Sequence, residues 1–195
     1  MAKQTGITLV ELMIGVAITA LLLMLAAPSL TTFVQNRQIR ATAESINDAI
    51  QLTRSEAMKN NSPVMFTLTT TVDDACIASS SGPNWVISSS DPTGACGSGP
   101  QVVQKRADAE STANTLIAAT QNAAVMGGQI SFNGFGRVTP NQAADIWIDV
   151  SNPAAGVCGN GASNMRCLRV VVSPGGMVKL CDPNVAYSLT NSQGC

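Results

Sequence analysis

Histidine is absent from this chain of 195 residues, and charged side chains make up only 12% of it. Without histidine there is no Ser-His or Cys-His pair for nucleophilic catalysis. We therefore expect no enzyme and no cofactor. The formal net charge of −1 predicts no general affinity for polyanions. The paired carboxylates Asp73-Asp74 and Asp145/Asp149 are expected to cap turns or to face solvent.

Cysteine is absent from the first 75 residues, so a lipoprotein anchor near the start is not expected. The six cysteines lie at Cys76, Cys96, Cys158, Cys167, Cys181 and Cys195. An even number of cysteines beyond an apolar N-terminal segment is typical of disulfides in an oxidising compartment. Of about 15 pairings, proximity in sequence favours Cys76–Cys96, Cys158–Cys167 and Cys181–Cys195. A metal site is not expected, because the cysteines are dispersed and histidine is missing.

Charge is also missing from a long N-terminal run, in which no charged residue follows Glu11 until Arg37. About 20 apolar residues suffice to cross a bilayer, so residues 7–30 are predicted to form a transmembrane helix. An ionised side chain in hydrocarbon costs about 2.5–3.5 kcal/mol on an insertion scale, so Glu11 indicates a function. An ordinary secretory signal and an unprocessed anchor are alternatives, but an acid at the start of the apolar region argues against a secretory signal.

A partner for Glu11 follows from a cut after Gly6. Such a cut makes Ile7 a new α-amine, four residues before Glu11. Between neighbouring helices in an assembly, the incoming ammonium group would neutralise the carboxylate of a subunit already in place. A buried ion pair of this kind sets register, and we assign that role to Glu11.

The helix is predicted to continue beyond the apolar run as an amphipathic segment, residues 31–61. Apolar residues recur there at alternating steps of four and three, and Arg40–Glu44 is an i,i+4 pair. The helix should end at Asn60-Asn61-Ser62-Pro63, and Pro28 should kink it. The positions of the apolar face are Ile39, Ala43, Ile46, Ile50, Thr53 and Ala57.

The remainder, residues 62–195, is predicted to be a β-rich domain that covers the amphipathic helix with antiparallel sheet, which makes the fold α+β. Segments of strand character, several alternating apolar with polar residues, lie at residues 64–70, 84–88, 101–104, 129–132, 145–150, 166–172 and 177–180. Residues 173–176 and Gly134-Phe135-Gly136 are interpreted as turns. Asp91-Pro92-Thr93-Gly94 is interpreted as a turn, with calcium binding as the alternative. Residues 107–127 are compatible with a strand and turn or with a short helix.

The leader carries a family resemblance. Gly6 followed by Ile7-Thr8-Leu9-Val10-Glu11-Leu12 resembles the class III signal of type IV pilins and type II secretion pseudopilins. The resemblance implies that a prepilin peptidase removes residues 1–6 and methylates the amine of Ile7. The first mature residue is usually Phe in that family, and Ile7 departs from the pattern.

Later motifs are similar to the GspH/FimT family. They are Trp85-Val86-Ile87, Asp91 to Cys96, Phe132 to Val138 and Arg166 to Pro183. The C-terminal pair Cys181–Cys195 is more similar to FimU/FimT-type minor pilins. The resemblance implies a disulfide-bonded pilin fold and a minor pilin that primes assembly at or near the fibre tip. Implied partners are other major and minor pilins and an inner-membrane assembly platform. The protein would start as a single-pass bacterial inner-membrane protein with a periplasmic domain and then enter the pilus fibre.

Two alternatives remain within the resemblance. One is a type II secretion pseudopilin. The other is a DNA-binding pilus subunit for DNA uptake in natural transformation, because some FimT-type members bind DNA through a Gly-Arg-x-Arg segment. The matching stretch here is Gly176-Met177-Val178-Lys179, in which only the glycine agrees. The cations available for phosphate contacts are Arg137, Arg166, Arg169 and Lys179, and the simpler interpretation is that they are solvated charges on strands.

Overall fold

The computed structural model describes residues 6, 8–97, 99, 101–107, 115–140, 143–153, 158, 166–188 and 190–195, without the side chains of residues 25–29. In this part of the chain one long helix, α1 (Leu9–Asn60), precedes ten strands. The chain divides into two units, residues 1–34 and 35–195.

The first sheet is built from strands on either side of β1 (Val64–Thr69). Its order is β3-β2-β1-β6-β7, and all its pairs are antiparallel. Its other members are β2 (Asn84–Ser88), β3 (Val102–Arg106), β6 (Gln129–Phe132) and β7 (Val138–Thr139). Alternation places Val64, Phe66 and Leu68 on the face toward α1, where all three side chains are buried.

The second sheet follows the order β10-β9-β8-β4-β5 and is also antiparallel. It contains β4 (Leu116–Gln121), β5 (Ala124–Val125), β8 (Ile146–Ser151), β9 (Leu168–Val172) and β10 (Val178–Cys181). Strand β8 alternates with Ile146, Ile148 and Val150 buried, because side chains of successive residues point to opposite faces. The hairpin between β9 and β10 turns at residues 173–177.

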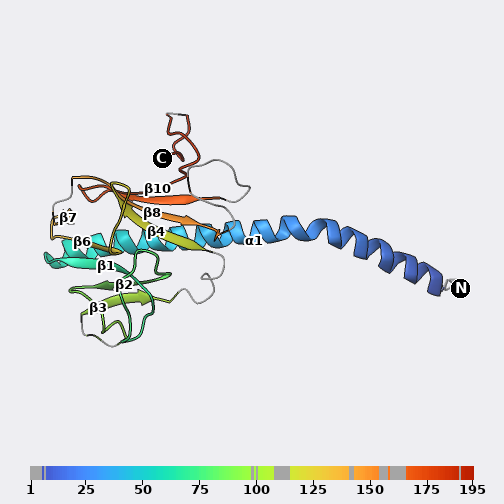
Figure 1. The fold of residues 1–195 in the computed structure, drawn as a ribbon, viewed down its shortest axis with the longest axis horizontal. Coiled ribbons are helices and arrows are strands. Elements are labelled where there is room, and N and C mark those ends of the chain that lie inside the picture. Colours follow the sequence, from blue (N-terminus) through green and yellow to red (C-terminus); the bar gives the residue numbers. More distant parts are fainter. Residues whose placement is uncertain are drawn as a thin grey trace, which may run out of the picture. The chain divides into compact units, whose positions relative to one another are not determined.

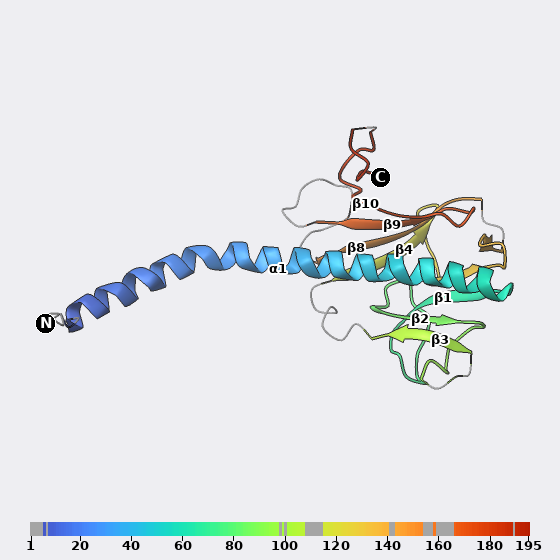
Figure 2. The same cartoon turned by 180° about the vertical axis from the view of Figure 1, so that it is seen from behind.

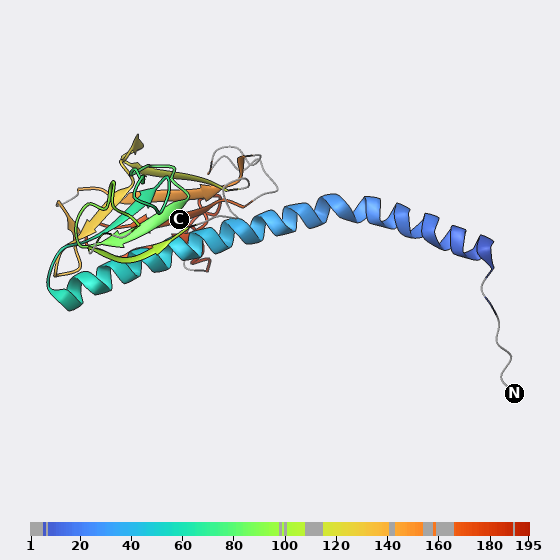
Figure 3. The same cartoon turned by 90° about the horizontal axis from the view of Figure 1, so that it is seen from below.

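Both sheets pack on the same helix. Figures 1 and 2 show β8, β9 and β10 on one side of the second half of α1 and β1, β2 and β3 on the other. In Figure 3 this part of α1 runs along the outside of the strands, which leaves its far side open. The buried residues of α1 and of the two sheets form one continuous cluster. One stripe of the helix is therefore buried in the same core as the inner faces of both sheets.

The periodicity of the helix is confirmed. Ile39, Ala43, Ile46, Ile50, Thr53 and Ala57 are each no more than 1% exposed. Thr53 is tolerated there because its hydroxyl donates to the carbonyl of Ala49 at 2.7 Å. The helix ends at Asn60, and Asn61 then adopts a positive φ of 46°, which is the left-handed conformation common at helix ends.

The strand predictions are confirmed to within one or two residues. The undecided segment resolves into β4 and the short β5, which join through Asn122 and Ala123 at positive φ. Residues 108–114 of that segment lie outside the described part of the chain. So does most of the loop from Asn152 to Asn164.

We predict that Ile46→Ala destabilises the domain by about 2–5 kcal/mol, since it leaves a cavity between the helix and both sheets. Gln51→Ala, on the exposed side of the same helix, should change stability by less than about 0.5 kcal/mol. Urea unfolding of the detergent-purified protein, followed by tryptophan fluorescence, measures both. Equal losses from the two variants would contradict the assignment of the helix faces.

Candidate assembly helix and its supporting domain

The start of α1 is capped by Thr8. Its hydroxyl accepts a hydrogen bond from the backbone N–H of Glu11 at 3.3 Å, and its carbonyl accepts one from Leu12 at 3.1 Å. A threonine in this position satisfies an N–H group that the helix itself leaves unpaired. Glu11 lies in the first turn of the helix, where the helix dipole favours a negative charge. The cap therefore places the one acid of the apolar run at the helix start.

Around Glu11 the first unit presents an apolar surface. Every large hydrophobic side chain from Leu9 to Met24 is between 54% and 80% exposed. The hydroxyl of Thr19 is internally satisfied, because it donates to the carbonyl of Gly15 at 2.6 Å. Among the described residues, the carboxylate of Glu11 has no hydrogen-bond or ion-pair partner within its own chain. The surface is thus incomplete without a covering medium or a neighbouring molecule.

Several predicted features of this segment fall on residues that the structure does not describe. Residues 1–5 and Ile7 are among them, and Gly6 is described only as exposed and non-helical. Pro28 lies within the bounds of α1, but its side chain is not described, so the predicted kink stays a prediction.

Within the described residues, no helical stretch combines the length and the apolarity needed to cross a membrane.

In the second unit long-range hydrogen bonds hold α1 to the domain. Trp85 on β2 donates its indole N–H to the hydroxyl of Ser45 at 3.0 Å. The Nε of Arg54 donates to the carbonyl of Gly136 at 3.1 Å, and the backbone N–H of Arg166 donates to Asn36 Oδ1 at 2.8 Å. Sequence reasoning did not find these bonds, because each partner lies at least 40 residues from the helix residue.

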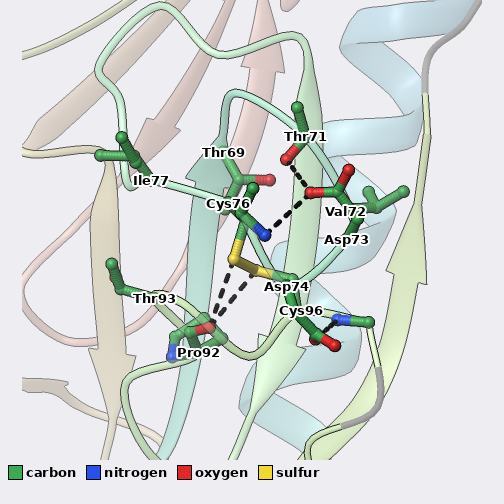
Figure 4. The surroundings of a disulfide bond; sticks show 12 residues. Thr69, Thr71, Val72, Asp73, Asp74, Cys76, Ile77, Pro92, Thr93 and Cys96 are labelled. Carbon is green, nitrogen blue, oxygen red and sulfur yellow. Dashed lines mark hydrogen bonds between the residues drawn. A yellow bond between two sulfur atoms is a disulfide. The ribbon is translucent and has the colours of Figure 1, made fainter.

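The disulfides join Cys76–Cys96, Cys158–Cys167 and Cys181–Cys195, which confirms the pairing favoured by proximity. Cys76–Cys96 closes a long loop over the outer face of the first sheet, where it packs on Val86. In Figure 4 both sulfur atoms lie beside the carbonyl oxygen of Pro92, at 3.3 and 3.4 Å. These are contacts rather than hydrogen bonds, because disulfide sulfurs carry no hydrogen.

Lys105 on β3 fastens the same loop. Its ammonium group donates to the carbonyls of Val72, Cys96 and Gly97 at 3.2, 3.1 and 2.7 Å. Because an ammonium group has three N–H donors, all of them are used. Asp74 adds a bond from the N–H of Gly97 at 2.8 Å. The loop is therefore closed by polar contacts as well as by its disulfide.

Two carboxylates of this region serve turns, as predicted. Asp91 Oδ1 accepts the N–H of Thr93, the hydroxyl of Thr93 and an amide hydrogen of Gln129, at 3.0, 2.7 and 3.0 Å. These donors, the Thr93 hydroxyl first, lower the pKa of Asp91 below its usual value, since they favour the charged form. Asp73 caps its own turn by accepting from the hydroxyl of Thr71 and the N–H of Ala75. No cluster of three or more candidate metal ligands occurs among the described residues.

The prediction for Asp149 was wrong. Its carboxylate forms a two-pronged ion pair with Arg169, at 2.6 Å to Nε and 2.8 Å to Nη2, and only 19% of its side chain is exposed. The guanidinium group also stacks on Trp147 at 4.3 Å from the ring centre. The hydrogen bonds from Arg169 to Asp149 raise the pKa of Arg169. The pairing of β8 with β9 brings Asp149 opposite Arg169, which could not be read from the sequence.

The four candidate phosphate-binding cations do not share one free surface. Arg169 is paired with Asp149, and Lys179 donates to the carbonyl of Gly194 at 2.9 Å while lying over the ring of Tyr187. Arg166 lies just before the start of β9. Arg137 lies near the other end of β9, because the next residue, Val138, donates its backbone N–H to the carbonyl of Pro174, which follows that strand. The two exposed arginines therefore lie at opposite ends of that strand.

A capped helix with an apolar surface and one acid, continuing into a two-sheet domain built on its own second half, defines a pilin-type subunit. The chain belongs to the GspH family: residues 42–176 match the family described as type II transport protein GspH. Residues 1–27 match the prokaryotic N-terminal methylation motif. Members of this class are structural subunits of pilin-like assemblies.

Among solved structures, the chain is similar to the type IV minor pilin FimU of Pseudomonas aeruginosa in two crystal forms. In one form the identity is 17%, the match covers 80% of this chain and 96% of FimU, and the TM-score is 0.51. In the other the identity is 18%, the coverage is 76% and 96%, and the TM-score is 0.46. At this identity the first match shows the shared pilin fold. The comparison with curated proteins finds no match.

We predict that Asp91→Asn makes the stability of the domain less dependent on pH. Because folding lowers the pKa of Asp91, the unfolded chain binds more protons as the pH falls below about 5. The stabilisation present above the ordinary carboxyl pKa is then lost as the pH falls through the lowered folded value. Asparagine keeps the Oδ1 acceptor but does not titrate in this range.

The measurement is the urea midpoint at several pH values between about 5 and 2.5, where ionisation of Asp91 changes. Thr93→Val, which removes the hydroxyl that lowers the pKa of Asp91 most, should also flatten the dependence of the urea midpoint on pH. If the urea midpoint of Asp91→Asn changed with pH as steeply as that of the wild-type protein, Asp91 would not be the group responsible.

Proposed function

We propose that this chain is a minor pilin of a type IV pilus, cleaved after Gly6 and methylated at Ile7 by a prepilin peptidase. The match of residues 1–27 to the N-terminal methylation motif supports the processing step. The observation that carries the proposal is Glu11, one carboxylate on a helix whose other large side chains up to Met24 are apolar and exposed.

Residues 7–30 are proposed as the membrane anchor and later as the assembly helix. They would rise about 36 Å at 1.5 Å per residue, against a hydrocarbon core of about 30 Å. Residues 31–61 would carry the helix into the domain, and residues 62–195 would complete that domain in the periplasm. Lys3 would stay in the cytoplasm, in agreement with the positive-inside rule.

In the fibre, Glu11 would set the position of each incoming subunit. The free α-amine of Ile7 is cationic, and it would approach the carboxylate of Glu11 on a neighbouring helix. Inside an apolar bundle an unpaired carboxylate is costly, so mismatched positions are disfavoured. The ion pair thus acts through specificity of register rather than through net stabilisation.

The shared fold with FimU, which is named a type IV minor pilin, supports a role as a minor subunit. In this role the chain would prime assembly at or near the fibre tip. Its partners would be major and minor pilins and the inner-membrane assembly platform. In sheared fibres this predicts few copies of the chain relative to the major pilin, with gold-labelled antibody at fibre ends.

A type II secretion pseudopilin is the second candidate, and the family description as a type II transport protein favours it. The two roles use the same processing and helix packing. Co-purification from crosslinked cells distinguishes them, because one role yields pilus subunits and the other yields secretion subunits. Recovery of secretion subunits alone would replace the pilus assignment.

We predict that the intact mass of the protein from its native host lacks residues Met1–Gly6, carries one methyl group and shows the deficit of three disulfides. Mass spectrometry of membrane-extracted protein measures all three changes together. Gly6→Leu should retain the leader, since it alters the cleavage site itself. An intact leader on functional wild-type protein would exclude the proposed processing.

We predict that Glu11→Gln is processed normally but enters fibres at least about tenfold less, because a neutral side chain cannot pair with the α-ammonium group; tenfold corresponds to about 1.4 kcal/mol. Immunoblots of sheared fibres and of membranes give the ratio. Glu44→Gln is the matched control, since Glu44 is half-buried and, among the described residues, pairs with Arg40 on the same helix. Equal incorporation of the two variants would remove the register role.

A further inference from the structure

Two hairpin turns meet at the C-terminal end of α1. One turn, Asn133 to Arg137, joins β6 to β7, and the other, Ser173 to Met177, joins β9 to β10. Gly176 abuts the carbonyl of Gly136 so closely that a side chain at Gly176 would collide with it. The two sheets therefore contact each other at this end of the domain through their turns.

The turn that carries Phe135 is held from several sides. Asn133 accepts the backbone N–H groups of Phe135 and Arg137 at 3.0 and 3.1 Å through its side-chain oxygen. Gly136 has a φ of 72°, a conformation that glycine adopts without strain. Its carbonyl accepts the hydrogen bond from Arg54 described above. Phe135 thus stands on a backbone whose conformation is already determined.

The side chains at this end are apolar and exposed. Phe135 is 83% exposed and Met177 is 67% exposed, the one on the first turn and the other on the second. Met58, 42% exposed, lies beside Gly136 on the last turns of α1. We call Phe135, Met177 and Met58 the distal patch. Aromatic residues, methionine and arginine are enriched at the centres of protein interfaces.

We infer that the distal patch binds the globular domain of a different pilin-type subunit, through an apolar socket with an acidic rim. This inference rests on the proposed function. The patch is flanked by Arg137, which is exposed, and by Arg54, while neither turn contains an acidic residue. Glu56, the acid on this part of α1, is already bound by Lys59 and Asn60. Charge complementarity therefore calls for carboxylates on the partner.

The rigid turn favours tight binding by Phe135. A preformed conformation avoids the ordering cost that a flexible loop would incur on binding. An exposed aromatic side chain that enters a desolvated socket is the usual centre of such an interface.

A membrane and a second copy fit the patch less well. From residue 35 to Arg54, α1 rises about 30 Å, so the patch and the start of the domain lie at opposite ends of this part of α1. Two copies meeting patch to patch would bring arginines together, and like charges in an interface are costly. Stacking end to end would meet a groove that is lined by Arg40 and Arg166 against one acid, Asp182, which gives the arginines of the patch no acidic rim.

The test places a photo-crosslinking phenylalanine analogue at position 135 of the full-length chain in the producing cells. Position 77 is the control, since Ile77 is 61% exposed but lies in the Cys76–Cys96 loop. The expected result is an adduct at position 135 and not at 77. The peptides crosslinked to position 135 should come from another chain of the same type. Such a chain has a leader that is cut after a glycine, followed by an apolar helix with a glutamate near its start.

Recovery of the crosslinked partner is then compared between variants of the patch. Phe135→Ala should lower recovery of that partner at least about tenfold, and Arg137→Glu should lower it as well, because it places a carboxylate against the acidic rim. Gln51→Ala, which changes an exposed residue on the same helix, should leave recovery unchanged. Since Phe135 is exposed, protein level and disulfide formation should not change in any variant.

Other outcomes overturn the inference. An adduct with a second copy, an adduct with lipid, or no adduct at position 135 would each do so, as would full recovery with Phe135→Ala. Leader cleavage and fibre entry are read in the same cells. If both occur without the adduct, the inference fails and the proposed function stands, whereas a retained leader removes the proposed function itself.

Discussion

One stripe of α1 forms the core for two sheets, and the rest of the domain depends on that shared burial. Ile39, Ile46 and Ile50 are almost completely excluded from solvent, and the cluster that contains them includes the inner faces of both sheets. Each sheet has one apolar face that must be buried, and the helix lies where both faces meet. The same helix, α1 (Leu9–Asn60), also contains the proposed assembly segment.

The two parts of α1 follow opposite rules. Residues from Leu9 to Met24 expose apolar side chains. The second half of the helix instead buries its apolar stripe against the two sheets of the same chain. A surface of the first kind is stable in lipid or against like helices, since water does not solvate it well. In that setting a single carboxylate has large consequences, because charge is weakly solvated there. Glu11 therefore carries more information about function than the acids of the domain.

On the outside of the domain, most distinctive polar groups are used internally. Lys105 closes a loop, Asp91 organises a turn, and Arg169 is shared between Asp149 and Trp147. The distal patch differs, because its side chains are apolar, exposed and mounted on a rigid turn.

Much of this organisation was determined by local sequence. The steps of four and three along α1, the alternation in β1 and β8, and the short spacing between paired cysteines predicted elements and disulfides, because each pattern reports geometry among near neighbours. The tertiary structure alone decided how the strands divide into two sheets, that Asp149 meets Arg169, and that the turns of Phe135 and Met177 touch. Those contacts depend on sheet order and register, which join residues far apart in the chain and leave no periodic trace in it.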